Sequence, residues 1–476
     1  MEKSYKNNTL LKKIISLDIF DINYIYGSEK LRKTNYPQKS LPKKGYFVRL
    51  FSLLHKTFLN FLRCDFFYFL RLDVHKIIFF IGTNNQYSTL SPVRNKCLNS
   101  ELVLIDYENK LTLPGTRRFP LFISYLLSIP FLSIVIKKYK TGTDYQKETF
   151  KYSLEEYMTI YGNFILFYYW FKWKKPTAVI LSNDHVAIYR TILYTCNELH
   201  IPTVFIPHAS STKFFPPLKF TYSLLEGVET VNNYLPNVYK SKIYLIGIPK
   251  FDNLIINKND HKEIKVIGIT TNPLDSISEF DHIINMLVTS FPKCEIFLRP
   301  HPSDKNNNNW KRLAQKYKIN FSNPLLEDSL DYLLQTDLII AGNSNILLEA
   351  ALLNVIPISY TPDQEIQDWY GFHQKKIIFK INTITGIKKF LLEHRNNRIN
   401  IKNNLKGFCD TINTPYEGSS SLLANILIDE IRENSKDLEK NKFWQKVVYK
   451  ETEIHKATGK FSNQNHANYE IFLLDN

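Results

Sequence analysis

The stretch EIFLRPHPSD, residues 295–304, contains a short apolar run and its polar exit. The apolar run 296–298 predicts a buried strand. Arg299 and His301 follow at once, each beside a proline that fixes the backbone and limits the entropy lost when a ligand binds. Because arginine offers paired donors that match a phosphate, we expect this loop to hold an anion. The alternative is that Arg299 pairs with a nearby carboxylate.

The same succession of apolar run and polar exit recurs along the chain. We predict strands at Ile77–Ile81, Leu102–Ile105, Ala178–Leu181, Thr203–Ile206, Ile243–Ile246, Ile264–Ile269, Glu295–Leu298, Asp337–Ala341 and Val355–Ser359. Helices are expected at Ser276–Thr289, Ile346–Leu353 and 421–433. Strands that alternate with helices indicate parallel sheets, which bind ligands outside the carboxyl ends of their strands. The predicted fold class is therefore α/β.

The chain divides into four parts. Residues 1–72 are expected to form a basic, aromatic helical extension, and 73–247 and 248–434 to form two Rossmann-like domains. Residues 435–476 turn polar, and we expect a peripheral helix or a loose tail there. The length of 476 residues is sufficient for two or three domains.

The net charge of +16 is concentrated near the N-terminus. Residues 1–72 hold 14 Lys and Arg against 5 Asp and Glu, a net charge of +9. Nucleic acid, an anionic membrane surface or an anionic substrate would each suit such a charge. No RNA-binding aromatic strand, zinc finger or helix-turn-helix signature stands out, so no nucleic-acid partner is expected.

Two segments raise the question of a membrane. In Tyr46–Leu72, apolar residues recur at helical spacing with basic residues between them. This predicts either an amphipathic helix on a membrane surface or a core helix with a solvated basic side. Residues 119–136 carry no charge but contain Pro130, and we expect a buried or interfacial helix there in preference to a spanning one.

The cysteines and the missing motifs exclude several kinds of site. The five cysteines are widely spaced and form no CxxC pair, which suits a reducing cytoplasm and disfavours disulfides or zinc. The N-terminus shows no secretory signal. No dinucleotide fingerprint, Walker loop, HExxH motif, GxSxG elbow or DxD pair is present. Neither a cofactor nor a metal ion is therefore expected.

Two strand exits in the first half carry candidate catalytic residues. Asp184 and His185 follow the predicted strand at 178–181. A carboxylate at this place can act as a base or a nucleophile that His185 tunes, and it can equally cap the next helix. His208 follows the strand at 203–206 and is a further candidate, although a lone histidine there is often structural.

In the second half, a glycine turn follows the strand at 337–341. Asn343 or Ser344 is expected to cap the next helix, whose free N–H groups would bind phosphate. Glu349, inside that helix, is a candidate for holding a pair of ribose hydroxyls. The alternative is an ordinary strand–turn–helix unit with a capping serine.

Taken together, these residues resemble bacterial glycosyltransferases of the GT-B architecture that build capsule and lipopolysaccharide. Among these, the residues resemble the β-Kdo transferases and the CDP-glycerol glycerophosphotransferases. The matching motifs are Arg299-Pro300-His301-Pro302, Ser344 with Glu349, His208, and Gly247-Ile248-Pro249-Lys250-Phe251-Asp252. The resemblance covers roughly residues 175–360. It implies a GT-B-like fold with two Rossmann-like domains facing a cleft, the acceptor side at 73–247 and the nucleotide-sugar side at 248–434.

The resemblance also implies roles for the candidate residues. The donor phosphate would be bound by Arg299, His301, Asn343 and Ser344, and the ribose by Glu349. The catalytic residues would be Asp184, His185 and His208. The reaction would be a metal-independent transfer from a nucleotide-sugar donor, CMP-Kdo in a retaining mechanism being the first choice, to a glycan or glycolipid acceptor. The enzyme would work in the cytoplasm, beside the anionic inner-membrane surface.

Three alternatives remain open from the sequence. The first is transfer of a polyol phosphate from CDP-glycerol, with His208 as the base. The second is a nucleotide-sugar epimerase on the same architecture, which would act on the donor alone. The third is a non-enzymatic accessory protein of the membrane surface, in which the polar strand exits would have no catalytic meaning.

Overall fold

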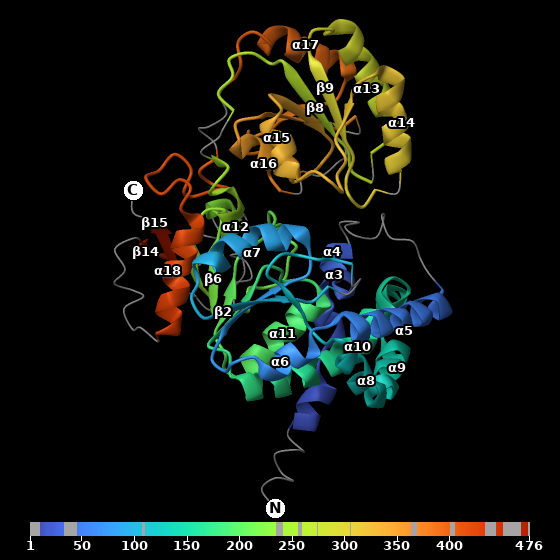
Figure 1. Ribbon diagram of the computed structural model, residues 1–476, viewed down its shortest axis with the longest axis vertical. Helices are drawn as coiled ribbons and strands as arrows, with labels where there is room; N and C mark the ends of the chain where they lie inside the picture. The colour runs from blue at the N-terminus through green and yellow to red at the C-terminus, as the bar shows by residue number, and fades with distance from the viewer. Residues whose placement is uncertain are drawn as a thin grey trace, which may run out of the picture. The chain divides into compact units, whose positions relative to one another are not determined.

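The computed structural model describes residues 10–32, 45–106, 110–234, 241–255, 259–273, 275–304, 306–362, 368, 370–399, 405–433, 444–450 and 468–474. It divides into two compact units, shown in Figure 1. Unit 1 comprises Met1–Lys250 and Ser420–Asn476, and unit 2 comprises Phe251–Ser419. The parts of the predicted extension and tail at 1–9, 33–44, 435–443, 451–467 and 475–476 lie outside the described residues.

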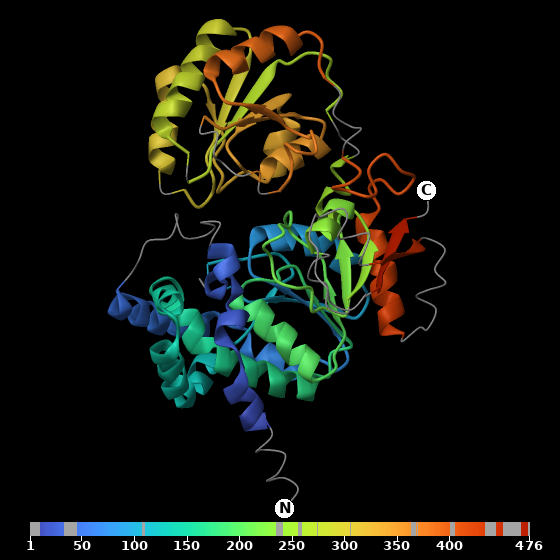
Figure 2. The ribbon, with the colours of Figure 1, turned by 180° about the vertical axis from the view of Figure 1, so that it is seen from behind.

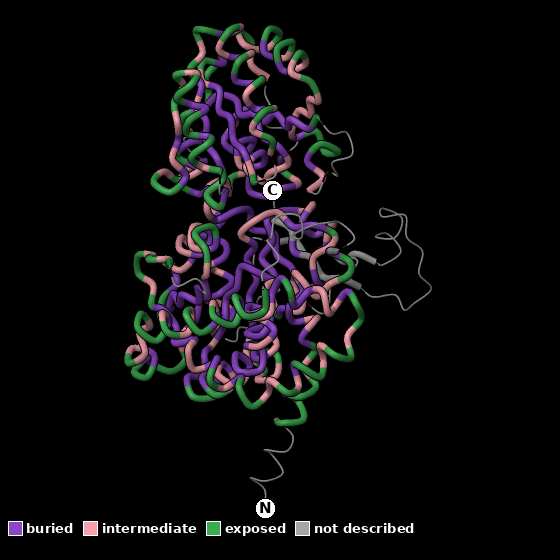
Figure 3. Tube along the Cα trace, turned by 90° about the vertical axis from the view of Figure 1, so that its right-hand side faces the viewer, coloured by how far each residue is buried: buried purple, intermediate pink, exposed green. Residues whose placement is uncertain are grey.

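Unit 1 is built on a nine-stranded sheet with the order β14-β15-β7-β6-β5-β4-β1-β2-β3. Its strands are β1 (Ile77–Ile81), β2 (Ser100–Leu104), β3 (Arg117–Arg118), β4 (Ala178–Leu181), β5 (Thr203–Phe205), β6 (Tyr222–Leu225), β7 (Lys242–Leu245), β14 (Trp444–Lys450) and β15 (Asn468–Leu474). All neighbouring strands are parallel except β14 and β15. The central strands are buried along their whole length, which explains why they read as continuous apolar runs; Figure 3 shows this burial.

Helices cover the sheet of unit 1. They are α2 (Ile19–Ile22), α3 (Tyr24–Gly27), α4 (Glu29–Arg32), α5 (Tyr46–Arg63), α6 (Phe66–Arg71), α7 (Asn84–Lys96), α8 (Phe122–Ser128), η1 (Ile129–Phe131), α9 (Leu132–Thr141), α10 (Asp144–Lys174), α11 (Ala187–Glu198), α12 (Val228–Tyr234) and α18 (Ser420–Arg432). The long helix α10 packs against α8 and α11, and α7 packs against α18. Ile19 and Ile22 share an apolar core with α10, so the N-terminal helices are built into unit 1.

Unit 2 contains a six-stranded parallel sheet with the order β10-β9-β8-β11-β12-β13. Its strands are β8 (Val266–Thr270), β9 (Glu295–Arg299), β10 (Asn320–Phe321), β11 (Leu338–Ala341), β12 (Ile356–Tyr360) and β13 (Phe379–Ile381). Its helices are α13 (Ile277–Ser290), α14 (Asn307–Tyr317), α15 (Ser329–Leu334), α16 (Ile346–Leu352) and α17 (Ile384–His394). The short turn η3 (Pro249–Phe251) leads into the unit from the end of unit 1.

The two parallel α/β sheets confirm the predicted fold class. Helix α18 packs with unit 1, whereas the predicted boundary at 434 placed its residues in the second domain. The described parts of the tail form β14 and β15 at the edge of the unit 1 sheet, where a helix or a loose segment was expected. Local patterns do not show which unit a late helix or strand will join, because that choice depends on contacts distant in sequence.

One described helical stretch, Phe122–Thr141, is long and apolar enough to cross a membrane, with a mean hydropathy of 1.4. It is not one straight helix. The turn η1, which contains Pro130, divides it into α8 and α9. Only 22% of its apolar window is buried, so of the two expected kinds of helix, buried and interfacial, the buried one does not fit most of its length.

Candidate functional site

In unit 1, three neighbouring strands end in acidic or imidazole side chains. Leu181 of β4, Phe205 of β5 and Ser223 of β6 lie in one row across the sheet. Three residues beyond that row stand Asp184, His208 and Glu226. Because strands in a sheet lie about 4.8 Å apart, equivalent positions on adjacent strands bring these groups to one edge. Sequence reasoning found the first two and missed Glu226.

Asp184 and His185 form a hydrogen-bonded pair at the end of β4. Asp184 is only 2% exposed. Its Oδ2 accepts a hydrogen bond of 2.6 Å from the hydroxyl of Tyr234, and its Oδ1 lies 2.9 Å from His185 Nδ1. A carboxylate partner assigns the proton to Nδ1 and leaves the lone pair on Nε2, which lies 3.5 Å from the side-chain amide nitrogen of Asn183 and can accept a proton. Tyr234 comes from α12, and no sequence motif pointed to it.

The backbone of this turn is held from several sides. Asn183 Oδ1 accepts the backbone N–H groups of His185 and Val186, at 3.0 and 2.9 Å. The buried Arg190 donates to the carbonyl of Asp184 at 3.0 Å. The next helix, α11, is capped by Val186 without a side-chain bond, so Asp184 does not serve as the helix cap. The capping role that the sequence also allowed for Asp184 is therefore not observed.

The N-terminal helices also reach this turn. The backbone N–H of Ile25 donates to the carbonyl of His185 at 3.1 Å. Arg190 pairs with Asp21 at 3.0 Å, and the same carboxylate accepts the hydroxyl of Tyr194. The region predicted as an extension thus helps to position the candidate catalytic pair.

His208 is half-buried at the end of β5. Its Nδ1 donates to the backbone carbonyl of Ser182, which again leaves the lone pair on Nε2. Desolvation lowers the pKa of His208 to about 4, so the imidazole is neutral near pH 7. The hydroxyl of Ser182 is buried beside it without a hydrogen-bond partner among the described residues. His208 is suited to orienting a hydroxyl group more than to removing its proton.

Glu226 is a buried carboxyl group at the end of β6. Thr230 donates to its Oε2 at 2.6 Å. Burial raises the pKa of Glu226 to about 7. A carboxyl group that titrates near neutrality at a strand exit is a further candidate for proton transfer. The signal in the sequence was the pair Glu226-Gly227 after an apolar run.

We expect Glu226→Gln to raise the free energy of unfolding at pH 8 by roughly 1–3 kcal/mol, since one pKa unit corresponds to about 1.4 kcal/mol. The folded protein holds the Glu226 proton more tightly than the unfolded chain does. In the unfolded chain the pKa of Glu226 is 4.5, and below this pH the group contributes its full stabilisation of the folded protein. This stabilisation is lost as the pH rises through about 7. Urea unfolding at pH 5 and pH 8 measures the difference. The exposed Asp73→Asn is the control, and an equal effect at both pH values would contradict the assignment.

In unit 2, Arg299 ends β9 and points into the domain. It is 5% exposed. Its guanidinium donates to Ser322 Oγ at 2.6 Å and to the carbonyl of Glu327 at 2.8 Å, and lies 3.5 Å from the Glu327 carboxylate. The guanidinium also stands over the ring of Tyr332, 5.5 Å from its centre. This is the alternative arrangement considered above, in which Arg299 pairs with a nearby carboxylate.

His301, two residues further on, is exposed. Its Nδ1 accepts the backbone N–H of Ser303 at 3.1 Å and lies 2.8 Å from the Ser303 hydroxyl. The N–H of the ring is therefore on Nε2, away from these contacts. Desolvation by the surrounding loop lowers the pKa of His301 below its usual value. The ring presents a neutral N–H donor at the edge of the sheet.

The turn after β11 differs in one detail from the prediction. The cap of α16 is Asn345, without a side-chain hydrogen bond to the backbone, whereas Asn343 or Ser344 was expected to cap it. Asn343 and Ser344 are half-buried in the turn itself, and the carbonyl of Ser344 accepts the N–H of Leu347 at 3.3 Å. Glu349 Oε1 accepts the side-chain amide of Asn345 at 3.3 Å. The helix begins at Ile346, as predicted, and its cap lies at Asn345, one residue after Ser344.

The register of the sheet places these loops at one edge. Thr270 of β8 pairs with Arg299 of β9 on one side and with Ala341 of β11 on the other. A Cβ at Gly342 would come within 2.4 Å of Asp275 Oδ1, so this turn lies close to the loop after β8. The loops that carry Arg299, His301, Asn343 and Ser344 therefore lie on two strands with β8 between them.

Buried hydroxyl groups line the same edge. Among the described residues, Thr270, Thr271 and Thr361 each have a buried hydroxyl without a hydrogen-bond partner. Burial raises the pKa of Asp275, which faces the same turn, to about 6. These hydroxyls and Asp275 give the edge several hydrogen-bonding groups.

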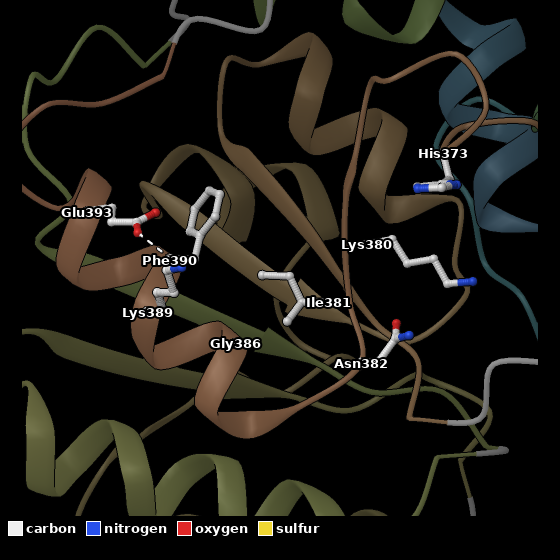
Figure 4. A pocket seen from close by; sticks show the side chains of 8 residues that line it. All are labelled: His373, Lys380, Ile381, Asn382, Gly386, Lys389, Phe390 and Glu393. Carbon is white, nitrogen blue, oxygen red and sulfur yellow. Dashed lines mark ion pairs between the residues drawn. The ribbon is translucent and has the colours of Figure 1, made fainter.

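Two other features complete the description of unit 2. A hollow of about 560 Å³ lies at the β13 edge beside α17, and Lys389 pairs with Glu393 there (Figure 4). It is lined by none of the strand-exit residues described above. In the part of the chain that the structure describes, no group of three or more His, Cys, Asp or Glu residues could hold a metal ion.

No protein-family profile matches the sequence. No curated protein sequence matches it either. The structure is similar to a crystal structure of UDP-N-acetylglucosamine 2-epimerase, with a TM-score of 0.50 and 13% identity, over 76% of this chain and 98% of that chain. The wall teichoic acid polymerase TagF matches with a TM-score of 0.49 and 13% identity, over 83% and 100% of the two chains. MurG from Acinetobacter baumannii matches with a TM-score of 0.43 and 10% identity, over 75% and 99%. At these identities the similarity concerns the fold alone.

Proposed function

We propose that the protein transfers a sugar or a sugar-like group from a nucleotide-activated donor to a hydroxyl group of a glycan or glycolipid acceptor, in the synthesis of a surface glycan. The observation that carries this proposal is the pair of Asp184 and His185 at the carboxyl end of β4, with both carboxylate oxygens bound. Such a pair is suited to removing a proton from an acceptor hydroxyl. Both units have a Rossmann-like fold, and the pair lies at the carboxyl end of a strand. Both features agree with a nucleotide-dependent enzyme.

His185 is the proposed general base. Asp184 holds the imidazole in the tautomer with a lone pair on Nε2 and stabilises the positive charge that forms when His185 takes the proton. The ring is further held by stacking on Phe215, with 4.6 Å between ring centres. His208, which is neutral, would orient the acceptor hydroxyl through its own Nε2. Direct attack by Asp184, which a retaining mechanism would need, is disfavoured by its burial and its two hydrogen bonds.

The donor nucleotide is proposed to bind at the carboxyl edge of the unit 2 sheet. The leaving phosphate would be held by the N–H of His301, by Asn343 and Ser344, and by the buried hydroxyls of Thr270, Thr271 and Thr361. Arg299 would position the loop, because its guanidinium is engaged inside the domain. Glu349 would bind the ribose. These donors would stabilise the departing charge without a metal ion.

The donor is proposed to be a cytidine nucleotide, because both groups of enzymes that this sequence resembles use one. CMP-Kdo is the first choice by resemblance. CDP-glycerol is a second choice that the geometry of Asp184 favours, because transfer of a polyol phosphate needs a base but no carboxylate nucleophile. The reaction would take place in the cytoplasm, as expected from the cysteines.

Assays with labelled CMP-Kdo, CDP-glycerol and UDP-N-acetylglucosamine, each with and without membrane acceptors, test the proposal. One cytidine donor is expected to yield labelled acceptor and free nucleotide. That nucleotide, added at about 100 times its Kd, should raise the free energy of unfolding by about 2.7 kcal/mol. Conversion of a donor in the absence of acceptor would indicate an epimerase. If no nucleotide bound or reacted, the proposal of an enzyme would be rejected and the non-enzymatic accessory role would be favoured.

A further inference from the structure

Helix α5 has its polar side turned toward the protein and its apolar side turned outward. The outward residues include Phe47, Phe51 and Phe58, which are 89, 74 and 59% exposed. Leu50, Leu54, Phe61 and Leu62 are exposed along with them. With about 3.6 residues per turn, these seven positions form one continuous stripe along the helix. A surface helix of a protein in water normally buries such a stripe.

Hydrogen bonds on the opposite side hold the helix in this orientation. Arg49 Nε donates to the carbonyl of Lys151 at 2.7 Å, and its guanidinium donates to Glu155 at 2.9 Å. Asn60 donates to the carbonyl of Phe119 at 3.2 Å, and its Oδ1 accepts the backbone N–H of Phe122 at 2.9 Å. Rolling the helix over to bury its apolar stripe would break all four bonds. The outward stripe is therefore part of the folded structure, and the alternative of a core helix with a solvated basic side is excluded for α5.

The apolar surface continues onto the neighbouring helix, α8. The rings of Phe61 and Phe122 are 5.2 Å apart. Leu126 and Ile129 follow Phe122 at the i+4 and i+7 positions and are exposed. Figures 1 and 2 both show α5, α8 and α9 side by side. We call the seven outward residues of α5, together with Phe122, Leu126 and Ile129, the apolar face.

Helix α8 is fixed to the core of unit 1. The N–H of Gly162, in α10, donates to the hydroxyl of Ser128 at 3.1 Å. A side chain at Gly162 would collide with the backbone of Ser124, so the two helices are in close contact. Helix α9 has ten residues and is about 15 Å long, half of the hydrocarbon thickness of a bilayer. Because α8 is held against α10 and α9 is too short to cross a bilayer, the stretch Phe122–Thr141 is suited to lying in the surface of a membrane and not to crossing it.

The charges around the apolar face favour an anionic partner. Besides the inward-facing Arg49, segments 46–72 and 122–141 contain the basic residues Lys56, Arg63, Arg71, Lys137, Lys138 and Lys140. Their one acidic residue is Asp65. In a symmetric dimer through this face, basic residues would meet basic residues, which disfavours a second copy as the occupant. A lipid surface with anionic headgroups satisfies both the apolar stripe and its basic surroundings.

We propose that α5 and α8 lie flat in the interfacial layer of a membrane that contains anionic lipid, with the apolar face in contact with the acyl chains. The proposal is independent of the proposed function, since it rests on the orientation of α5 and not on the strand-exit residues. It assigns to α5 and α8 a specific surface and orientation. The side chains inserted deepest would be those at the centre of the stripe, Phe51 and Phe58.

Binding of the full chain to vesicles tests the proposal. The wild-type protein is expected to float with vesicles of phosphatidylcholine and phosphatidylglycerol, and more weakly with phosphatidylcholine alone. Replacing both Phe51→Glu and Phe58→Glu should lower the partition coefficient at least about tenfold. The control carries Leu98→Glu and Leu392→Glu, two apolar residues outside the face that are 74 and 66% exposed, and it should bind like the wild type.

A spectroscopic readout does not depend on the folding of the double variant. The emission of Phe58→Trp is expected to shift to shorter wavelength when anionic vesicles are added, whereas that of Leu98→Trp should not shift. Three results would overturn the proposal. The double variant could bind vesicles as well as the wild type does. The wild type could bind neutral and anionic vesicles equally. It could also form dimers in solution that the double variant lacks, without binding vesicles, in which case a second copy covers the face.

Discussion

Replacing His185 with alanine is expected to lower the rate of group transfer about 10²–10⁴-fold while the donor nucleotide still binds with unchanged affinity. The reason is that His185 is the proposed base of unit 1, whereas the proposed nucleotide-binding groups belong to unit 2. The turnover number at saturating donor, measured beside nucleotide binding by calorimetry, separates the two effects. His282→Ala, which removes an exposed histidine from α13, is the matched control and should keep full activity.

A second substitution tests how the base is held. Asp184→Asn replaces the acceptor of the His185 Nδ1 proton with an amide that can present its N–H₂ group, which favours the wrong tautomer. We expect a loss of turnover of the same order as for His185→Ala, and a smaller loss for Tyr234→Phe, which removes one hydrogen bond to the carboxylate. If His185→Ala reacted normally while Asp184→Ala did not, Asp184 would be the nucleophile that the resemblance implies.

The sheets were largely predictable because their strands are short apolar runs with polar ends. The predicted strands at 77–81 and 178–181 coincide with β1 and β4 to the residue. Strand β6, Tyr222–Leu225, was missed because its apolar run is interrupted by Ser223. The edge strands β3, β10 and β13 are only two or three residues long. Whether such short segments form strands depends mainly on pairing with the neighbouring strand.

The direction of side chains at strand ends was not predictable. The sequence pattern placed Asp184 and Arg299 at exits, but whether each points outward depends on partners far along the chain. Tyr234 lies 50 residues from Asp184, and Glu327 lies 28 residues from Arg299. Helix α5 shows the same limit. The sequence showed its apolar stripe. Which side of the helix is buried depends on the hydrogen bonds of Asn60 to Phe119 and Phe122, which the sequence did not show.

Replacing Arg299 with alanine is expected to destabilise unit 2 by roughly 2–3 kcal/mol, below the usual range for breaking a fully buried ion pair because the partner, Glu327, is partly exposed. The substitution removes hydrogen bonds to Ser322 and to the carbonyl of Glu327, and leaves a gap over the ring of Tyr332. The loop 322–327 should lose its attachment to β9. Hydrogen exchange of its amides, together with urea unfolding, measures the effect.

The control is Arg312→Ala, an exposed arginine in α14 whose removal should change the stability of the unit by less than about 0.5 kcal/mol. Nucleotide binding gives the decisive comparison. If Arg299 positions the loop, Arg299→Ala should weaken nucleotide binding and raise hydrogen exchange at 322–327 together, and Ser322→Ala should do both to a smaller degree. If instead Arg299→Ala abolished nucleotide binding with stability and exchange unchanged, the guanidinium would turn toward the ligand and bind the phosphate directly. That result would restore the role that the motif Arg299-Pro300-His301-Pro302 predicts and would show that the inward orientation belongs to the unliganded protein.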